Sequence, residues 1–134
     1  IGIPTAYIPD QTLRLKLYRR LADIKDETAL ATVEMEFEDR FGPLPEQVRN
    51  LIFQIKVKLM AGEAGLASVG FEGRQIVLRY PALPEGIKSR DLPEIGRDVW
   101  SGKNAYRIHF TDPQNEPWQE KLIATLLQIK AFTD

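Results

Sequence analysis

Apolar residues recur every three or four positions in three consecutive segments of the first half of the chain. That spacing places them on one side of an α-helix, so it predicts helices over about residues 11–24, 27–41 and 46–64. Phe37 and Leu51 are expected to be buried where the second and third helices meet. The apolar stripes of the first two helices are Leu13, Leu17, Leu21 and Ile24, and Leu30, Val33, Phe37 and Phe41.

Residues that start and stop helices stand at the ends of these segments. Asp10 and Asp26 precede the first two helices. They are typical N-caps, because a carboxylate accepts hydrogen bonds from the free backbone N–H groups of the first turn. Gly42 and Gly65 follow the second and third helices, where glycine commonly ends a helix. Pro45 suits the first turn of the third helix, so short connections are expected between the three.

The pattern changes after residue 65, where runs rich in β-branched and aromatic residues replace the helical spacing. The three residues 72–74 between two such runs predict a hairpin. A regular apolar stripe that begins at Trp118 predicts a final helix. The elements expected in this half are strands over about 66–71, 75–80 and 105–110, and helices over about 89–98 and 117–132.

These elements predict an α+β fold in the order ααα-ββ-α-β-α, with a small antiparallel sheet. A three-helix bundle over about 1–64 would be followed by a mixed part over about 65–134. At 134 residues the whole chain is expected to be one domain, 1–134, and a monomer on its own. It opens at Ile1 rather than Met, so we expect it to be a piece of a longer protein.

The charge balance weakens the case for a nucleic-acid-binding protein. The 18 basic and 19 acidic residues give a formal net charge of −1, whereas binding to phosphates needs a concentrated positive field. The absence of cysteine excludes disulfides and fits a reducing cytosol. No apolar run approaches the roughly 18 residues that span a bilayer, and no signal peptide is evident. The expected location is therefore the cytoplasm, with no membrane contact.

The residues that carry catalysis are nearly absent. His109 is the only histidine, and there is no cysteine to serve as a nucleophile. One histidine among scattered carboxylates has no metal-ligand spacing. No G-x-x-x-x-G-K-[ST] loop is present to hold nucleotide phosphates. We therefore expect no catalytic, cofactor-binding or metal-binding residues and no binding of ATP. An enzyme would instead require a pocket of convergent polar groups around His109.

Two helices carry charge that could meet a partner. The predicted first helix carries Arg14, Lys16, Arg19 and Arg20, which leaves open an accessory DNA-contacting domain.

The predicted second helix has an outer side with Met35 at its edge, Thr32, and two acids, Glu36 and Asp39, three positions apart. This side is either an ordinary solvated surface or a docking face for a partner that brings arginine. Met35 would supply adaptable apolar contact in the second case.

Several short motifs resemble the C-terminal domain of bacterial transcription-repair coupling factors. They fall in the family's order and spacing across roughly residues 3–51, whereas the likeness beyond residue 65 rests on the order of elements. The residues that carry it are Tyr7-Ile8-Pro9-Asp10, Arg14-Leu15, Tyr18-Arg19-Arg20-Leu21-Ala22, Glu36, Asp39-Arg40-Phe41-Gly42, Leu44-Pro45, Val48 and Asn50-Leu51.

The resemblance implies a parent protein that is an ATP-driven DNA translocase of transcription-coupled nucleotide excision repair. Such a parent removes stalled RNA polymerase and recruits the repair machinery, and its motor domains would lie outside this chain. The C-terminal domain of the family packs on the N-terminal module that binds the excinuclease A protein and masks it. The resemblance places the docking element on the second helix, with Glu36 as the matching acid.

Overall fold

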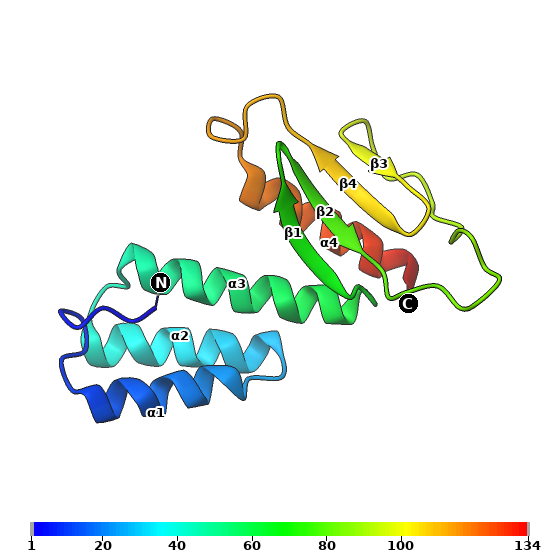
Figure 1. Ribbon diagram of the computed structural model, residues 1–134. Coiled ribbons are helices and arrows are strands. Elements are labelled where there is room, and N and C mark those ends of the chain that lie inside the picture. Colours follow the sequence, from blue (N-terminus) through cyan, green and yellow to red (C-terminus); the bar gives the residue numbers. More distant parts are fainter. Residues whose placement is uncertain (1, 134) are drawn as a thin grey trace. The chain divides into compact units, whose positions relative to one another are not determined.

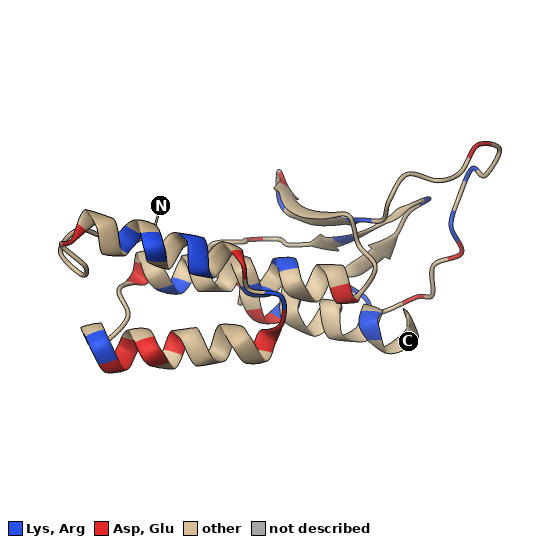
Figure 2. Ribbon diagram, turned by 90° about the horizontal axis from the view of Figure 1, so that it is seen from below, with Lys and Arg blue, Asp and Glu red and all other residues tan. Residues whose placement is uncertain are grey.

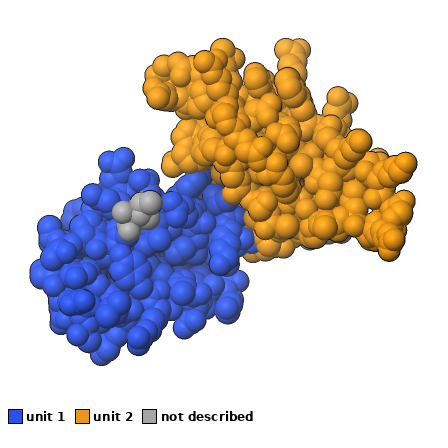
Figure 3. Space-filling view, in the orientation of Figure 1, with its two compact units in different colours: residues 1–59 blue, residues 60–134 orange. Residues whose placement is uncertain are grey.

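The computed structural model describes residues 2–133, and they form two compact units. Unit 1 covers residues 1–59 and unit 2 covers residues 60–134 (Figure 3). The change of pattern expected near residue 65 therefore lies close to the boundary between the units. The expected fold class, α+β with an antiparallel sheet, is confirmed. That the chain is a single domain stays a prediction.

Unit 1 contains three helices connected by short turns. They are α1, Gln11–Ala22, α2, Glu27–Phe41, and α3, Glu46–Glu63, whose last turn belongs to unit 2. Figure 1 shows α1 and α2 side by side and running in opposite directions. Each helix lies within about two residues of its predicted bounds, so the stripes of apolar residues identified all three.

The predicted caps of α1 and α2 are confirmed. The Asp10 side chain accepts hydrogen bonds from two backbone N–H groups of the first turn of α1. The Asp26 side chain does the same for the N–H of Ala29, at 2.8 Å. Gly42 ends α2 with φ of 90°, a backbone conformation that only glycine adopts without strain. A side-chain cap at Asp26 and the backbone freedom of Gly42 therefore set the two ends of α2.

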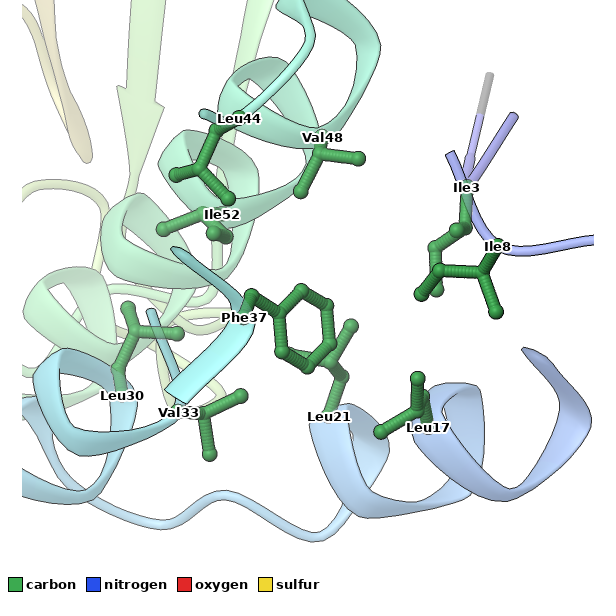
Figure 4. Packing of buried hydrophobic residues seen from close by; sticks show 10 residues of the cluster. All are labelled: Ile3, Ile8, Leu17, Leu21, Leu30, Val33, Phe37, Leu44, Val48 and Ile52. Carbon is green, nitrogen blue, oxygen red and sulfur yellow. The ribbon is translucent and has the colours of Figure 1, made fainter. Parts of the chain in front are cut away.

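Phe37 of α2 is fully buried in the core of unit 1. Figure 4 shows its ring pointing into the space between Leu17 and Leu21 of α1 and Val48 of α3. Leu51, expected beside it, is only partly buried and packs against the same cluster. The buried members of the cluster are Ile3, Ile8, Leu17, Leu21, Leu30, Val33, Phe37, Leu44, Val48 and Ile52.

The segment before α1 is fastened to unit 1 by side chains. Ile3 and Ile8 are buried in the core. The backbone N–H of Ile3 donates to the hydroxyl of Tyr18, at 2.5 Å. The Tyr7 hydroxyl donates toward two carbonyl oxygens at the end of α2, those of Phe37 at 3.1 Å and Gly42 at 2.8 Å. Burial, and to a lesser extent Glu38, raises the pKa of Tyr7.

Unit 2 is a four-stranded antiparallel sheet with a helix along one face (Figure 1). The strands lie in the order β1-β2-β4-β3, and the hairpin expected at 72–74 joins β1 to β2. Ile76 lies opposite Ile108, and Leu78 opposite Tyr106, so that these four buried residues share one face. The elements are β1 Ser68–Glu72, β2 Gln75–Arg79, β3 Val99–Ser101, β4 Ala105–His109 and α4 Trp118–Thr133.

α4 also contributes buried residues to the core of unit 2. Leu122, Leu126 and Ile129 of the predicted stripe are buried, as is Thr125 beside them. Trp118, the first residue of the stripe, packs edge-on against Phe71, with ring centroids 5.0 Å apart. The stripe was therefore predicted correctly, and it covers the buried face of the sheet.

The expected short helix at 89–98 is wrong. Residues 81–98 have no helix, and the strand β3 follows them. Apart from one turn between Pro84 and Ile87, the backbone hydrogen bonds given for residues 81–98 go to residues beyond the segment. The Arg90 N–H donates to the Lys103 carbonyl at 2.6 Å, and the Tyr106 hydroxyl donates to the Pro93 carbonyl at 2.5 Å. Pro93 also lacks the N–H that a helix would need there.

The buried hydroxyl of Tyr106 should make unit 2 sensitive to alkali. Burial, with smaller contributions from Tyr80 and Asp91, raises the pKa of Tyr106 to about 12 from 10.0. The folded state therefore holds this proton more tightly than the unfolded state does. The resulting stability is complete below about pH 10 and is lost as the pH rises toward about 12. Tyr106→Phe should flatten the fall of the urea midpoint over that interval, and an equally steep fall would contradict the assignment.

Candidate docking face on α2

The side of α2 opposite its buried stripe is open to solvent. Leu30, Val33 and Phe37 point into unit 1, so Thr32 and Met35 lie on the far side of the helix. Both are exposed, and the Met35 side chain is the more prominent, at 67%. A methionine that is exposed to this extent presents flexible apolar area on the surface. Asp39 is exposed as well. Thr32, Met35 and Asp39 are therefore exposed, as expected from the sequence.

Glu36 differs from the other three residues of the predicted face. Its Oε2 forms an ion pair with Nη1 of Arg20 on α1, and 34% of its side chain is exposed. It therefore lies at the edge of the face that borders α1 rather than in the middle of the outer side. Both side chains lean toward the N-terminus of their own helix, so in an antiparallel pair they lean toward each other. The docking face is defined here as Thr32, Met35, Glu36 and Asp39.

An open hollow lies beside this face, between the end of α1 and the start of α2. Its volume is about 450 Å³, and Arg20 and Thr32 both line it. Ile24, Ala29 and Val33 contribute an apolar lining.

Charge is distributed unevenly over unit 1. Figure 2 shows basic residues along α1 and acidic residues gathered toward the C-terminal end of α2. Two of the α1 cations are already engaged. Arg14 Nη1 donates to the carbonyls of Ile8 and Pro9, at 2.8 and 2.9 Å, and Arg20 binds Glu36. The α1 face therefore offers phosphates fewer unengaged cations than the sequence suggested, which weakens the DNA-contacting alternative.

His109 lies on the surface of unit 2. It is exposed on β4, and its ring stacks on Trp100 with centroids 5.0 Å apart and planes 7° apart. An exposed stacked ring does not have the enclosed polar surroundings that the enzyme alternative requires. Within residues 2–133, no group of three or more histidine or acidic side chains is placed to hold a metal ion. The same residues contain no helix long and apolar enough to cross a membrane.

Comparison with known proteins identifies one family. A family model described as "TRCF domain" matches residues 1–86. The transcription-repair-coupling factor of Staphylococcus haemolyticus is 25% identical over 125 residues, which are 90% of this chain and 11% of the relative. That of Rickettsia conorii is 32% identical over 80 residues, or 60% of this chain and 7% of the relative. That of Escherichia coli K12 is 36% identical over 64 residues, or 48% and 6%.

A solved structure shares the fold along almost the whole chain. It is the crystal structure of a C-terminal domain of a transcription-repair coupling factor, with a TM-score of 0.73 and 19% sequence identity. The alignment covers 99% of this chain and 90% of that one. The chain thus matches nine-tenths of a solved domain but spans only about a tenth or less of the length of these three relatives.

Proposed function

Because this chain belongs to the TRCF domain family, we propose that it is an autoinhibitory interaction domain of a transcription-repair coupling factor. In this proposal the docking face binds the N-terminal module of the same protein and hides that module's site for the excinuclease A protein. Engagement with RNA polymerase would release the contact. The parent would be a cytoplasmic, ATP-driven DNA translocase acting in nucleotide excision repair.

The observation that carries the proposal is the composition and exposure of the docking face. Met35 is exposed at 67%, beside the partly open carboxylate of Glu36 and the exposed carboxylate of Asp39. Such a surface suits a partner that brings arginine, which binds carboxylates through two parallel hydrogen bonds, together with apolar area. Asp10, Asp26 and Gly42 hold the ends of α1 and α2, so the face is presented on a rigid scaffold.

Glu36→Ala in the full-length factor should raise its affinity for the excinuclease A protein. Removal of one member of a desolvated charge pair costs about 2 kcal/mol or more, because the other charge stays buried. The equilibrium constant for closure would then fall roughly 30-fold. The affinity for the excinuclease A protein would rise, but by no more than the factor by which closure lowers it in the wild-type factor. Binding of the excinuclease A protein to wild-type and variant factor, measured by titration calorimetry, reports the difference.

Glu38→Ala is the matched control. Glu38 carries the same charge two positions away, is exposed, and lies about 160° around the helix from Glu36. It should change the binding of the excinuclease A protein much less. Equal effects of the two substitutions would indicate general electrostatics, and no effect of Glu36→Ala would leave Glu36 an ordinary surface glutamate.

A further inference from the structure

The carboxylate that the proposed docking requires is already bound inside unit 1. Glu36 Oε2 pairs with Arg20 Nη1, while Glu36 Oε1 has no hydrogen-bond partner among residues 2–133. An incoming arginine normally uses both oxygens of a carboxylate. While Arg20 stays in place, a partner's arginine therefore has access to only one oxygen without competition.

The Arg20–Glu36 pair is weak enough to be exchanged. The side chains are 42% and 34% exposed, so water screens their attraction. An exposed pair of this kind shifts an equilibrium only by about 1.5- to fivefold. An arginine that loses water on docking binds a carboxylate more strongly than this exposed pair does.

We infer that Arg20 is an internal competitor for Glu36, which lowers the affinity of the docking face for its arginine-bearing partner. The inference rests on the function proposed above. Docking exchanges one guanidinium for another on Glu36, and Arg20 moves aside. The strength of the Arg20–Glu36 pair therefore affects the equilibrium between the docked and released states. Arg20 has this effect although it lies outside the docking face.

The displaced Arg20 side chain can move into the open hollow between α1 and α2. It lines the open hollow together with two acids, Asp23 and Asp26, and one other cation, Lys25. The Asp26 carboxylate already caps α2 through the N–H of Ala29, whereas Asp23 is exposed at the end of α1. Arg20 can thus remain hydrated near acidic groups after the exchange. No charge is left buried and unpaired on this side of the contact, and the exchange remains reversible.

The test is Arg20→Gln in the full-length factor, with Arg19→Gln as the control. Arg19 is the adjacent cation of the same last turn of α1 and is exposed, so its loss removes the same formal charge without touching Glu36. With the competitor gone, the equilibrium should shift toward the closed state. Affinity for the excinuclease A protein should therefore fall about 1.5- to fivefold below that of Arg19→Gln.

Glu36→Gln separates the two ways in which this test can fail. In that background Arg20→Gln should add nothing beyond Arg19→Gln, because the contested carboxylate is gone. If Glu36→Gln alone leaves the binding of the excinuclease A protein unchanged, the proposed function fails and the inference fails with it. If Glu36→Gln raises binding but Arg20→Gln matches Arg19→Gln, or raises binding as well, the docking face stands and competition by Arg20 is refuted.

Discussion

Phe37→Ala should lower the free energy of unfolding by about 3–5 kcal/mol, because it empties the centre of unit 1. The Phe37 ring is fully buried, with the Phe41 ring edge-on to it at 6.0 Å between centroids. Removing an aromatic side chain from such a site leaves a cavity that neighbours on three elements cannot fill completely. A domain of this size has a total stability of roughly 5–15 kcal/mol, so the variant should be close to unfolding.

A urea titration followed by far-ultraviolet circular dichroism measures this loss. Met35→Ala on the same helix is the control, since that side chain is 67% exposed and its removal should move the midpoint little. If the two midpoints shift equally, the buried face of α2 is not the one described. The docking face on its other side would then be misplaced too.

Leu126→Ala should have a comparable effect on unit 2, about 2–5 kcal/mol. Leu126 lies on the inner side of α4 and is 1% exposed, against a sheet whose inner residues are also buried. Both tryptophans of the chain, Trp100 and Trp118, belong to this unit. Their fluorescence therefore follows the unfolding of unit 2 directly.

Leu127→Ala provides the matched control for that measurement. It deletes the same atoms one position along α4, but the Leu127 side chain is 54% exposed. Its fluorescence midpoint should stay near that of the wild type. A larger shift for Leu127→Ala than for Leu126→Ala would mean that α4 presents a different side to the sheet.

The helices could be predicted from sequence because their signals are local. A carboxylate at Asp10 or Asp26 and a glycine at Gly42 act within one turn, and the stripe that includes Phe37 repeats every three or four residues. Such signals depend on the helix itself rather than on its neighbours. The exposure of Thr32, Met35 and Asp39 follows from the same periodicity, since these residues lie away from the stripe.

Features that depend on distant residues escaped prediction. Residues 89–98 form no helix, because partners such as the Tyr106 hydroxyl and the Lys103 carbonyl lie beyond the segment. The Arg20–Glu36 pair was missed for a similar reason. In two antiparallel helices joined by a short turn, these residues are about seven positions apart along the helix axis, which is roughly 10 Å. The two side chains can meet only because both are long and both tilt toward the N-terminus of their own helix.

The fastening of the segment before α1 also governs how unit 1 bears mechanical load. Because Ile3 and Ile8 are buried in the core and Tyr7 binds carbonyls at the end of α2, we expect a force applied at Ile3 to act on the core before it unwinds the first turn of α1. The tension passes through the core to α2 itself. A force on the segment before α1 would therefore reach the helix that carries the docking face.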